Sequence, residues 1–141
     1  LEKVPLFQGC SSIFLHNLAL SLKPVVCAAG EYIVRKGEPG QEMYVVCRGQ
    51  VEVIDGDGRL LDTLAEGNFF GETSLLLTQQ RTASVRAATS CDLFVLDKAD
   101  FNRVLKDHPE FAKSILDISR QRYQLSVAPA DAFDPQVRRL L

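Results

Sequence analysis

The sequence contains no run of about 18 or more apolar residues, the length expected of a helix that crosses a lipid bilayer. Its start, LEKVPLFQGC, also lacks the long apolar stretch of a secretory signal peptide. These absences predict a segment that is soluble and not inserted in a membrane. They leave open that the chain is a piece of something larger.

The sequence has no excess of positive charge, since 16 Lys and Arg residues face 18 Asp and Glu residues, for a net charge of −2. Broad binding to nucleic acid needs a basic face that neutralises phosphates. We therefore expect no nucleic-acid partner. One small anion is not excluded, because a single arginine can bind it.

The four cysteines form no C-x-x-C motif, and none has a histidine neighbour at zinc-site spacing. Cys27, Cys47 and Cys91 lie in or beside apolar runs that resemble strands, where a thiol acts as a small hydrophobic side chain. We expect these three and Cys10 to be free, reduced thiols in a cytosolic setting.

Histidine is absent from residues 25–96, and the chain has only His16 and His108, which we expect at the surface. Metal-dependent enzymes on jelly-roll scaffolds need clustered His and carboxylate ligands from their strands. Cleavage of a phosphodiester would also need a metal or a base. The sequence therefore predicts a protein that is not an enzyme and that holds neither a metal nor a cofactor.

What is present is ordinary globular composition, with 46% hydrophobic and 24% charged residues in 141. This length fits one domain, whose core forms without disulfides or metal. An apolar segment at residues 12–22 predicts a helix, with Ser11 or Ser12 as its N-cap and Pro24 beyond its end.

Between residues 25 and 96 the chain consists of short runs rich in Val, Ile, Leu, Tyr and Phe, most of them bounded by glycine turns. The runs are VVCAAG, EYIVRKG, MYVVCRG, VEVIDGDG, RLLDTLAEG, ASVRA and CDLFVL. IDGDGRL predicts a tight hairpin in which Gly56 or Gly58 has positive φ. Turn signals every 8 to 12 residues or so favour an antiparallel sandwich or barrel.

Helical periodicity returns after the strands. Asp97 is a predicted N-cap, and Asp100 three residues later completes a weak capping box. Pro109 either breaks this helix or begins the next one, which we place at about residues 110–125. The end of the chain, residues 126–141, contains two prolines and several alanines and is interpreted as a tail or linker.

The stretch FFGETSLLLTQQRTASV, residues 69–85, interrupts the strand region where another hairpin is expected. Its glycine permits close backbone approach, and ETSLLL can form one or two helical turns whose first N–H groups favour an anion. The guanidinium of Arg81 suits a pair of phosphate oxygens. Glu72 would repel a phosphate but can accept a hydrogen bond from a neutral hydroxyl such as that of a ribose. Together these residues suggest a sugar-phosphate site.

The motif FGETSLL…QRTASVRA resembles the phosphate-binding cassette of the cyclic-nucleotide-binding domain family. EYIVRKGEPGQEMYVVCRGQVEV is similar to the strands and glycine turns that precede the cassette, and KVPLF with LALSLKP is similar to the helix before them. The resemblance covers roughly residues 3–125 and is greatest to the cyclic-nucleotide-gated and hyperpolarisation-activated channels. It implies a binding domain at residues 1–125, followed by the tail at 126–141.

The fold expected from the sequence and the resemblance is α+β. It consists of an antiparallel, jelly-roll-like β-roll of seven or eight strands, an N-terminal helix, a short phosphate-binding helix and two C-terminal helices.

The resemblance also implies a role for each cassette residue. The backbone N–H groups of Gly71 and Glu72 would face the cyclic phosphate, and the Glu72 carboxylate would accept from the ribose 2′-hydroxyl. Arg81 would pair with the exocyclic phosphate oxygens. Thr82 would bind the phosphate and, with a syn base, the amino group of guanine.

Four further residues are candidate ligand contacts. Arg122 falls where channel relatives place an arginine over the purine, with a solvated helix face as the alternative. Val45 and Phe70 either line the base pocket or pack in the core. Thr73 departs from the Ile, Leu or Met usual after the glutamate, which puts local packing in doubt rather than phosphate chemistry.

The implied function is a cytosolic sensor domain that binds cGMP or cAMP as a ligand and couples binding to closure of the C-terminal helix. Gating of a cation channel is the implied output, with a regulatory domain of a kinase or exchange factor as the alternative. A transcription regulator of the catabolite-activator type would need a helix-turn-helix after Leu125, and too few residues follow.

The partners implied by the resemblance are the cyclic nucleotide and the rest of a channel polypeptide, with its pore and linker N-terminal to this segment. Such a parent protein would place the segment on the cytoplasmic side of a membrane and is compatible with a homo-oligomer.

Overall fold

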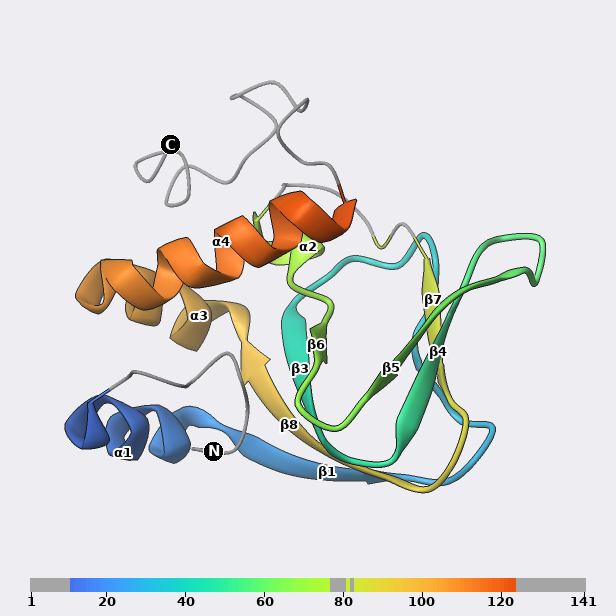
Figure 1. The fold of residues 1–141 in the computed structure, drawn as a ribbon, viewed down its shortest axis with the longest axis horizontal. Coiled ribbons are helices and arrows are strands. Elements are labelled where there is room, and N and C mark those ends of the chain that lie inside the picture. The colour runs from blue at the N-terminus through green and yellow to red at the C-terminus, as the bar shows by residue number, and fades with distance from the viewer. Residues whose placement is uncertain (1–10, 77–80, 82, 124–141) are drawn as a thin grey trace.

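The computed structural model describes residues 11–76, 81 and 83–123, which fold into two antiparallel sheets with helices at one end (Figure 1). The helices are α1 (Ser12–Ser21), α2 (Thr73–Leu76), α3 (Lys98–Asp107) and α4 (Pro109–Tyr123). The strands are β1 (Lys23–Cys27), β2 (Tyr32–Val34), β3 (Glu42–Arg48), β4 (Gln50–Ile54), β5 (Leu60–Ala65), β6 (Phe69–Phe70), β7 (Ser84–Ala87) and β8 (Cys91–Asp97).

The strands form two four-stranded sheets, in the orders β1-β8-β3-β6 and β2-β7-β4-β5. Every pairing is antiparallel, and several pairs join strands that are distant in sequence, such as β3 and β8, in which Glu42 lies opposite Asp97. The predicted α+β class, with an antiparallel β-roll between an N-terminal helix and C-terminal helices, is confirmed.

Two hydrophobic clusters meet at β3, where Met43, Tyr44, Val45 and Val46 are all buried. Because side chains alternate along a strand, Met43 and Val45 face the helices while Tyr44 and Val46 face the second sheet. The helix-side cluster is Phe14, Leu15, Leu18, Leu22, Met43, Val45, Phe69, Leu75, Leu76, Leu96, Phe101, Val104, Phe111, Ile115 and Leu116. The inter-sheet cluster is Cys27, Val34, Tyr44, Val46, Val51, Leu64, Phe70, Val85, Ala87, Cys91, Leu93 and Val95.

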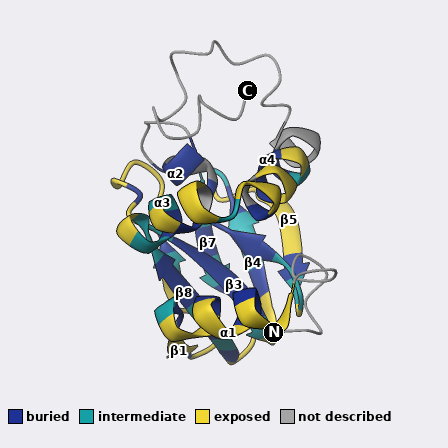
Figure 2. Ribbon diagram, turned by 90° about the vertical axis from the view of Figure 1, so that its left-hand side faces the viewer, coloured by how far each residue is buried: buried dark blue, intermediate teal, exposed yellow. Residues whose placement is uncertain are grey.

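Helices α1, α3 and α4 pack on the side of the first sheet that carries Met43 and Val45, and each exposes part of its surface to solvent, whereas Leu75 and Leu76 of α2 are buried (Figure 2). Among the described residues, no helix has both the length and the apolar character needed to cross a bilayer. Cys27, Cys47 and Cys91 are free thiols, and burial raises the pKa of Cys27 and of Cys47.

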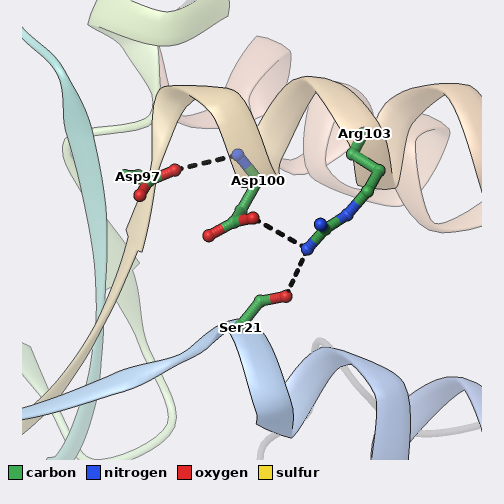
Figure 3. Close-up of polar contacts among 4 residues, drawn as sticks. All are labelled: Ser21, Asp97, Asp100 and Arg103. Atoms are coloured by element: carbon green, nitrogen blue, oxygen red, sulfur yellow. Dashed lines mark hydrogen bonds and ion pairs between the residues drawn. The ribbon is translucent and has the colours of Figure 1, made fainter.

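The caps of α1 and α3 follow the sequence. The Ser11 hydroxyl accepts from the N–H of Phe14 at 3.1 Å, and the Asp97 carboxylate accepts from the N–H of Asp100 at 2.8 Å (Figure 3). The Asp100 carboxylate, expected to return to the cap, instead pairs at 2.7 Å with Arg103. Arg103 also donates to the hydroxyl of Ser21, so this cluster ties α3 to α1.

Element boundaries agree closely with the expected ones. Pro109 occupies the first position of α4, as one of its two predicted roles required. In the hairpin between β4 and β5, Gly58 is the residue with positive φ, at 84°. The strand β6 was not expected, because its two phenylalanines were assigned to the interruption, yet they pair with Tyr44 and Val45 of β3.

Candidate functional site

The predicted interruption is a sharp turn followed by a single helical turn. After β6 the chain turns at Gly71, and the Glu72 carbonyl then accepts from the N–H groups of Leu75 at 3.0 Å and Leu76 at 2.8 Å, which starts α2. Leu75 and Leu76 are buried in the helix-side cluster and anchor this turn to the core. The expected short helix is therefore present, with four residues.

Gly71 is required here for two reasons. Its φ is +85°, in the left-handed region that side chains with a Cβ rarely adopt. A Cβ at this position would also lie 2.9 Å from Nη1 of Arg81 and 3.0 Å from the carbonyl oxygen of Glu42. The glycine thus lets the Arg81 side chain lie directly against the backbone of the turn.

Arg81 is only 8% exposed and is held by main-chain groups. Its Nη1 donates to the Gly71 carbonyl at 2.7 Å, and its Nη2 donates to the Glu42 carbonyl at 2.8 Å. Its own N–H donates to the carbonyl of Glu38 at 2.8 Å. Burial lowers the pKa of the guanidinium, while Tyr44 and nearby carboxylates act in the opposite direction. The result is a fixed cation at the junction of the turn, β3 and the segment before β3.

A cavity of about 210 Å³ lies beside this cation. It is lined by Ile33, Val34, Arg35, Glu38, Pro39, Gln41, Glu42, Tyr44 and Arg81. On its wall the Tyr44 hydroxyl donates to Oε1 of Glu42 at 3.1 Å. Burial and the Glu42 carboxylate raise the pKa of Tyr44 to about 12. The cavity therefore combines apolar side chains, two arginines of which Arg81 is buried, a neutral phenol and the carboxylates of Glu38 and Glu42.

A larger cavity of about 540 Å³ lies between α1 and α3. None of the predicted site residues lines it. By size alone this cavity would be the better candidate for a ligand site. The smaller cavity, however, contains the buried guanidinium of Arg81, the predicted anion-binding group.

Glu72 is completely buried, and α4 supplies a hydrogen-bond donor to its carboxylate. The Ser119 hydroxyl, also completely buried, donates to Oε2 of Glu72 at 3.0 Å. The last helix lies over the cassette in Figure 1, so residues 47 positions apart meet beneath it. Sequence reasoning did not identify Ser119. The available signal was its place four and eight residues after Ile115 and Phe111, on the buried stripe of the helix.

Val45 and Phe70 are both core residues, 2% and 1% exposed. Val45 belongs to the helix-side cluster. The Phe70 ring stacks on that of Tyr44, with centroids 5.0 Å apart, and so supports the cavity wall from behind. Neither of them lines the cavity itself.

Three of the predicted contact residues have side chains outside the described part of the chain. Thr73 begins α2 and Arg122 lies near the end of α4, but their side chains are outside the described part of the chain. Thr82 lies outside the described residues altogether. The described residues also contain no group of three or more His, Cys, Asp or Glu side chains arranged to hold a metal ion.

Comparison with known proteins identifies similar chains. The family profile described as "Cyclic nucleotide-binding domain" matches residues 24–108. A "Cyclic nucleotide-gated channel" of Caenorhabditis elegans is 41% identical over 128 residues, covering 86% of this chain and 18% of its own length. "Cyclic nucleotide-gated channel beta-1" of Homo sapiens is 39% identical over 135 residues, covering 92% of this chain and 11% of its own length.

Among solved structures, the Catabolite Activator Protein of Thermus thermophilus superposes with a TM-score of 0.77 at 27% identity. The match covers 86% of this chain and 59% of that one. The chain thus spans less than a fifth of the length of the channel relatives and just over half of this structural relative.

Proposed function

The chain belongs to the cyclic nucleotide-binding domain family, and from this premise we propose that it binds cGMP or cAMP as a regulatory ligand. The observation that carries the proposal is the buried Arg81 guanidinium, fixed against Gly71 and Glu42 beside a cavity. A desolvated, preorganised guanidinium favours a bidentate anion such as a phosphodiester.

The assignment of ligand groups follows from this position. The cyclic phosphate would lie at Arg81 and the backbone N–H groups of Gly71 and Glu72, with the ribose at Glu72. Thr82 would contact the phosphate and a guanine amino group, and Thr73, Val45 and Phe70 would shape the pocket. A purine would then meet α4, where Arg122 is the proposed capping residue.

We propose that α4 transmits binding. Its buried residues Phe111, Ile115 and Leu116 pack in the same cluster as Leu75 and Leu76 of the cassette. A displacement of the cassette would therefore change the packing of this helix against the core. A ligand shifts the position of α4 by its difference in affinity for the two arrangements.

The channel relatives favour gating of a cation channel as the output, over a role in a kinase or exchange factor. In this proposal residues 1–125 form a binding domain without catalytic activity on the cytoplasmic side of the membrane. The pore and linker of the same polypeptide, in a homo-oligomer, are its partners, and residues 126–141 are a tail.

The test is thermal unfolding of the chain with cGMP, cAMP and AMP, followed by calorimetry. A ligand that binds only the folded state raises the melting temperature, and the rise grows with the logarithm of the ligand concentration above its Kd. We expect a rise with at least one cyclic nucleotide and none with AMP at the same concentration. No rise with either cyclic nucleotide, together with a rise caused by zinc or iron, would instead favour a metal-dependent enzyme.

A further inference from the structure

Two buried cysteines lie directly opposite each other on neighbouring strands. Cys27 is the last residue of β1 and Cys91 is the first residue of β8. The register of this antiparallel pair makes the two residues partners. Both side chains belong to the inter-sheet cluster, so both leave the first sheet on the same face.

This placement meets the geometric requirements of a disulfide. Opposed residues of an antiparallel pair have Cα atoms about 4.5 or 5.5 Å apart, according to whether the pair is hydrogen-bonded. Both separations lie within the range of about 4.4–6.8 Å that is usual for disulfides, provided that the Cβ atoms do not point apart. Cys27 and Cys91 satisfy both conditions, because they are opposed and share a face.

In the reduced protein both thiols act as packed side chains. Cys27 is 5% exposed and Cys91 is 1% exposed. The Cys91 thiol is within donor distance of the carbonyls of Gln50 and Thr89, each at 3.2 Å. Burial raises the pKa of Cys27, and Glu31 and Cys91 add to the rise. Closing a disulfide requires the Cys91 side chain to rotate about its Cα–Cβ bond, which gives up only these weak S–H contacts.

Both cysteines adjoin turns that solvent reaches. Residues 28–30 follow Cys27, residues 88–90 precede Cys91, and all of these residues are exposed. Helices α1 and α3 join the opposite ends of the same two strands (Figure 1). Because the ends of elements open more readily than their middles, local opening beside these turns exposes the thiols to a small reagent without unfolding the helix-side cluster.

We propose that Cys27 and Cys91 form a redox-sensitive dithiol, which a small-molecule disulfide such as oxidised glutathione converts into an intramolecular disulfide. One cysteine thiolate attacks a sulfur of the reagent, breaks its S–S bond and releases one glutathione. The second cysteine thiolate attacks the cysteine sulfur of the resulting mixed disulfide and releases the other glutathione. The protein loses two protons and two electrons, the reagent gains them, and the new S–S bond joins β1 to β8.

The cross-link encloses residues 28–90, which include β3 and all four strands of the second sheet. In the chain-entropy account a disulfide stabilises a protein by restricting its unfolded state, and a long enclosed segment increases the effect. The oxidised chain should therefore melt about 5–15 °C higher than the reduced chain. This inference does not depend on nucleotide binding.

The experiment treats the folded 141-residue chain with oxidised glutathione and compares it with three variants. The C10S/C47S variant retains only the opposed pair, and C27A and C91A are made in that background. Alanine is used at the buried positions because a serine hydroxyl there would need a hydrogen-bond partner.

In C10S/C47S, mass spectrometry should show the loss of two hydrogen atoms and, after digestion, a peptide linked through Cys27 and Cys91. The melting temperature should rise, and dithiothreitol should reverse both changes. C27A and C91A should bind at most one glutathione and show no such rise. The peptide map of the unaltered chain needs no variant, so it decides the point if a variant fails to fold.

Three results would overturn the inference. The first is a pair that stays reduced in the folded chain at reagent concentrations that link it in urea. The second is a peptide map of the unaltered chain in which Cys27 and Cys91 are linked to other cysteines rather than to each other. The third is an oxidised C10S/C47S chain that melts no higher than its reduced form.

Discussion

At the scale of single residues, Arg81 has a structural role as well as a proposed role in ligand binding. Two of its N–H groups bind the carbonyls of Gly71 and Glu42, so the same side chain that would meet the phosphate also ties the cassette to β3. An arginine at such a position affects both stability and binding, and the two effects have to be measured separately.

We predict that Arg81→Ala weakens cyclic nucleotide binding by about 2–4 kcal/mol, the order of a lost buried charge-assisted contact. Arg81→Lys keeps the charge but not the planar fork, so it should recover only part of the affinity. Calorimetry gives the affinities, and urea unfolding of each variant gives the separate loss of stability. Unchanged affinity in a folded Arg81→Ala chain would remove the cassette assignment.

Tyr44 gives a prediction about pH. Burial and Glu42 raise its pKa to about 12, above the value of about 10 of an exposed tyrosine. Because the folded state prefers the protonated phenol, the stability gained from this group is complete below about pH 10 and is lost as the pH rises towards 12.

Titration of phenolate absorbance in the folded chain should therefore show a component near pH 12. Tyr44→Phe should abolish that component. Titration of all the tyrosines together near pH 10, while the chain is still folded, would contradict the burial of this phenol.

At the scale of elements, the turn before α2 depends on one glycine. Gly71 and Gly58 have nearly the same φ, +85° and +84°, but differ in their surroundings. A Cβ at Gly58 meets nothing within 4 Å, whereas a Cβ at Gly71 would meet Arg81 and the Glu42 carbonyl. Alanine at Gly58 therefore tests backbone strain alone, whereas alanine at Gly71 tests backbone strain together with displacement of Arg81.

We predict that Gly58→Ala costs about 1–2 kcal/mol of unfolding free energy, the cost of a left-handed conformation for an L-residue. Gly71→Ala should cost more, and it alone should weaken binding of a cyclic nucleotide. Denaturant unfolding and calorimetry measure the two quantities. Equal stability losses, with affinity intact in both variants, would show that Arg81 does not need the space left by Gly71.

Elements with local signals were predictable from the sequence, and contacts between distant elements were not. The Asp97 cap, the glycine hairpin after Ile54 and the single turn after Glu72 depend on residues within a few positions of one another. The bond from Arg103 to Ser21 spans 82 positions, and the bond from Ser119 to Glu72 spans 47. Spacing along the chain carries no information about such pairs, so Asp100 was assigned to the cap and Ser119 was not identified.

At the scale of the whole molecule, β3 joins the two hydrophobic clusters. Its buried residues alternate between the helix side and the inter-sheet side, and its Glu42 carbonyl accepts from Arg81. The proposed phosphate contact therefore rests on the strand shared by both cores. The helices that would move with the ligand pack against only the helix-side cluster. This asymmetry suits a rigid phosphate site on β3 beneath helices that can move.

The last prediction concerns the boundary of the domain. Within the described part of the chain, the buried side chains of both clusters come from residues 14–116. We therefore predict that a chain shortened to residues 1–125 keeps the melting temperature and the nucleotide affinity of the full chain. A chain ending at residue 108 lacks Phe111, Ile115 and Leu116, which contribute about 1.5–3 kcal/mol each when buried. Since small domains are stable by only about 5–15 kcal/mol, this shorter chain should be severely destabilised. Thermal unfolding of the three chains in parallel decides the point: if the 1–125 chain were as unstable as the 1–108 chain, residues 126–141 would belong to the folded domain rather than to a tail.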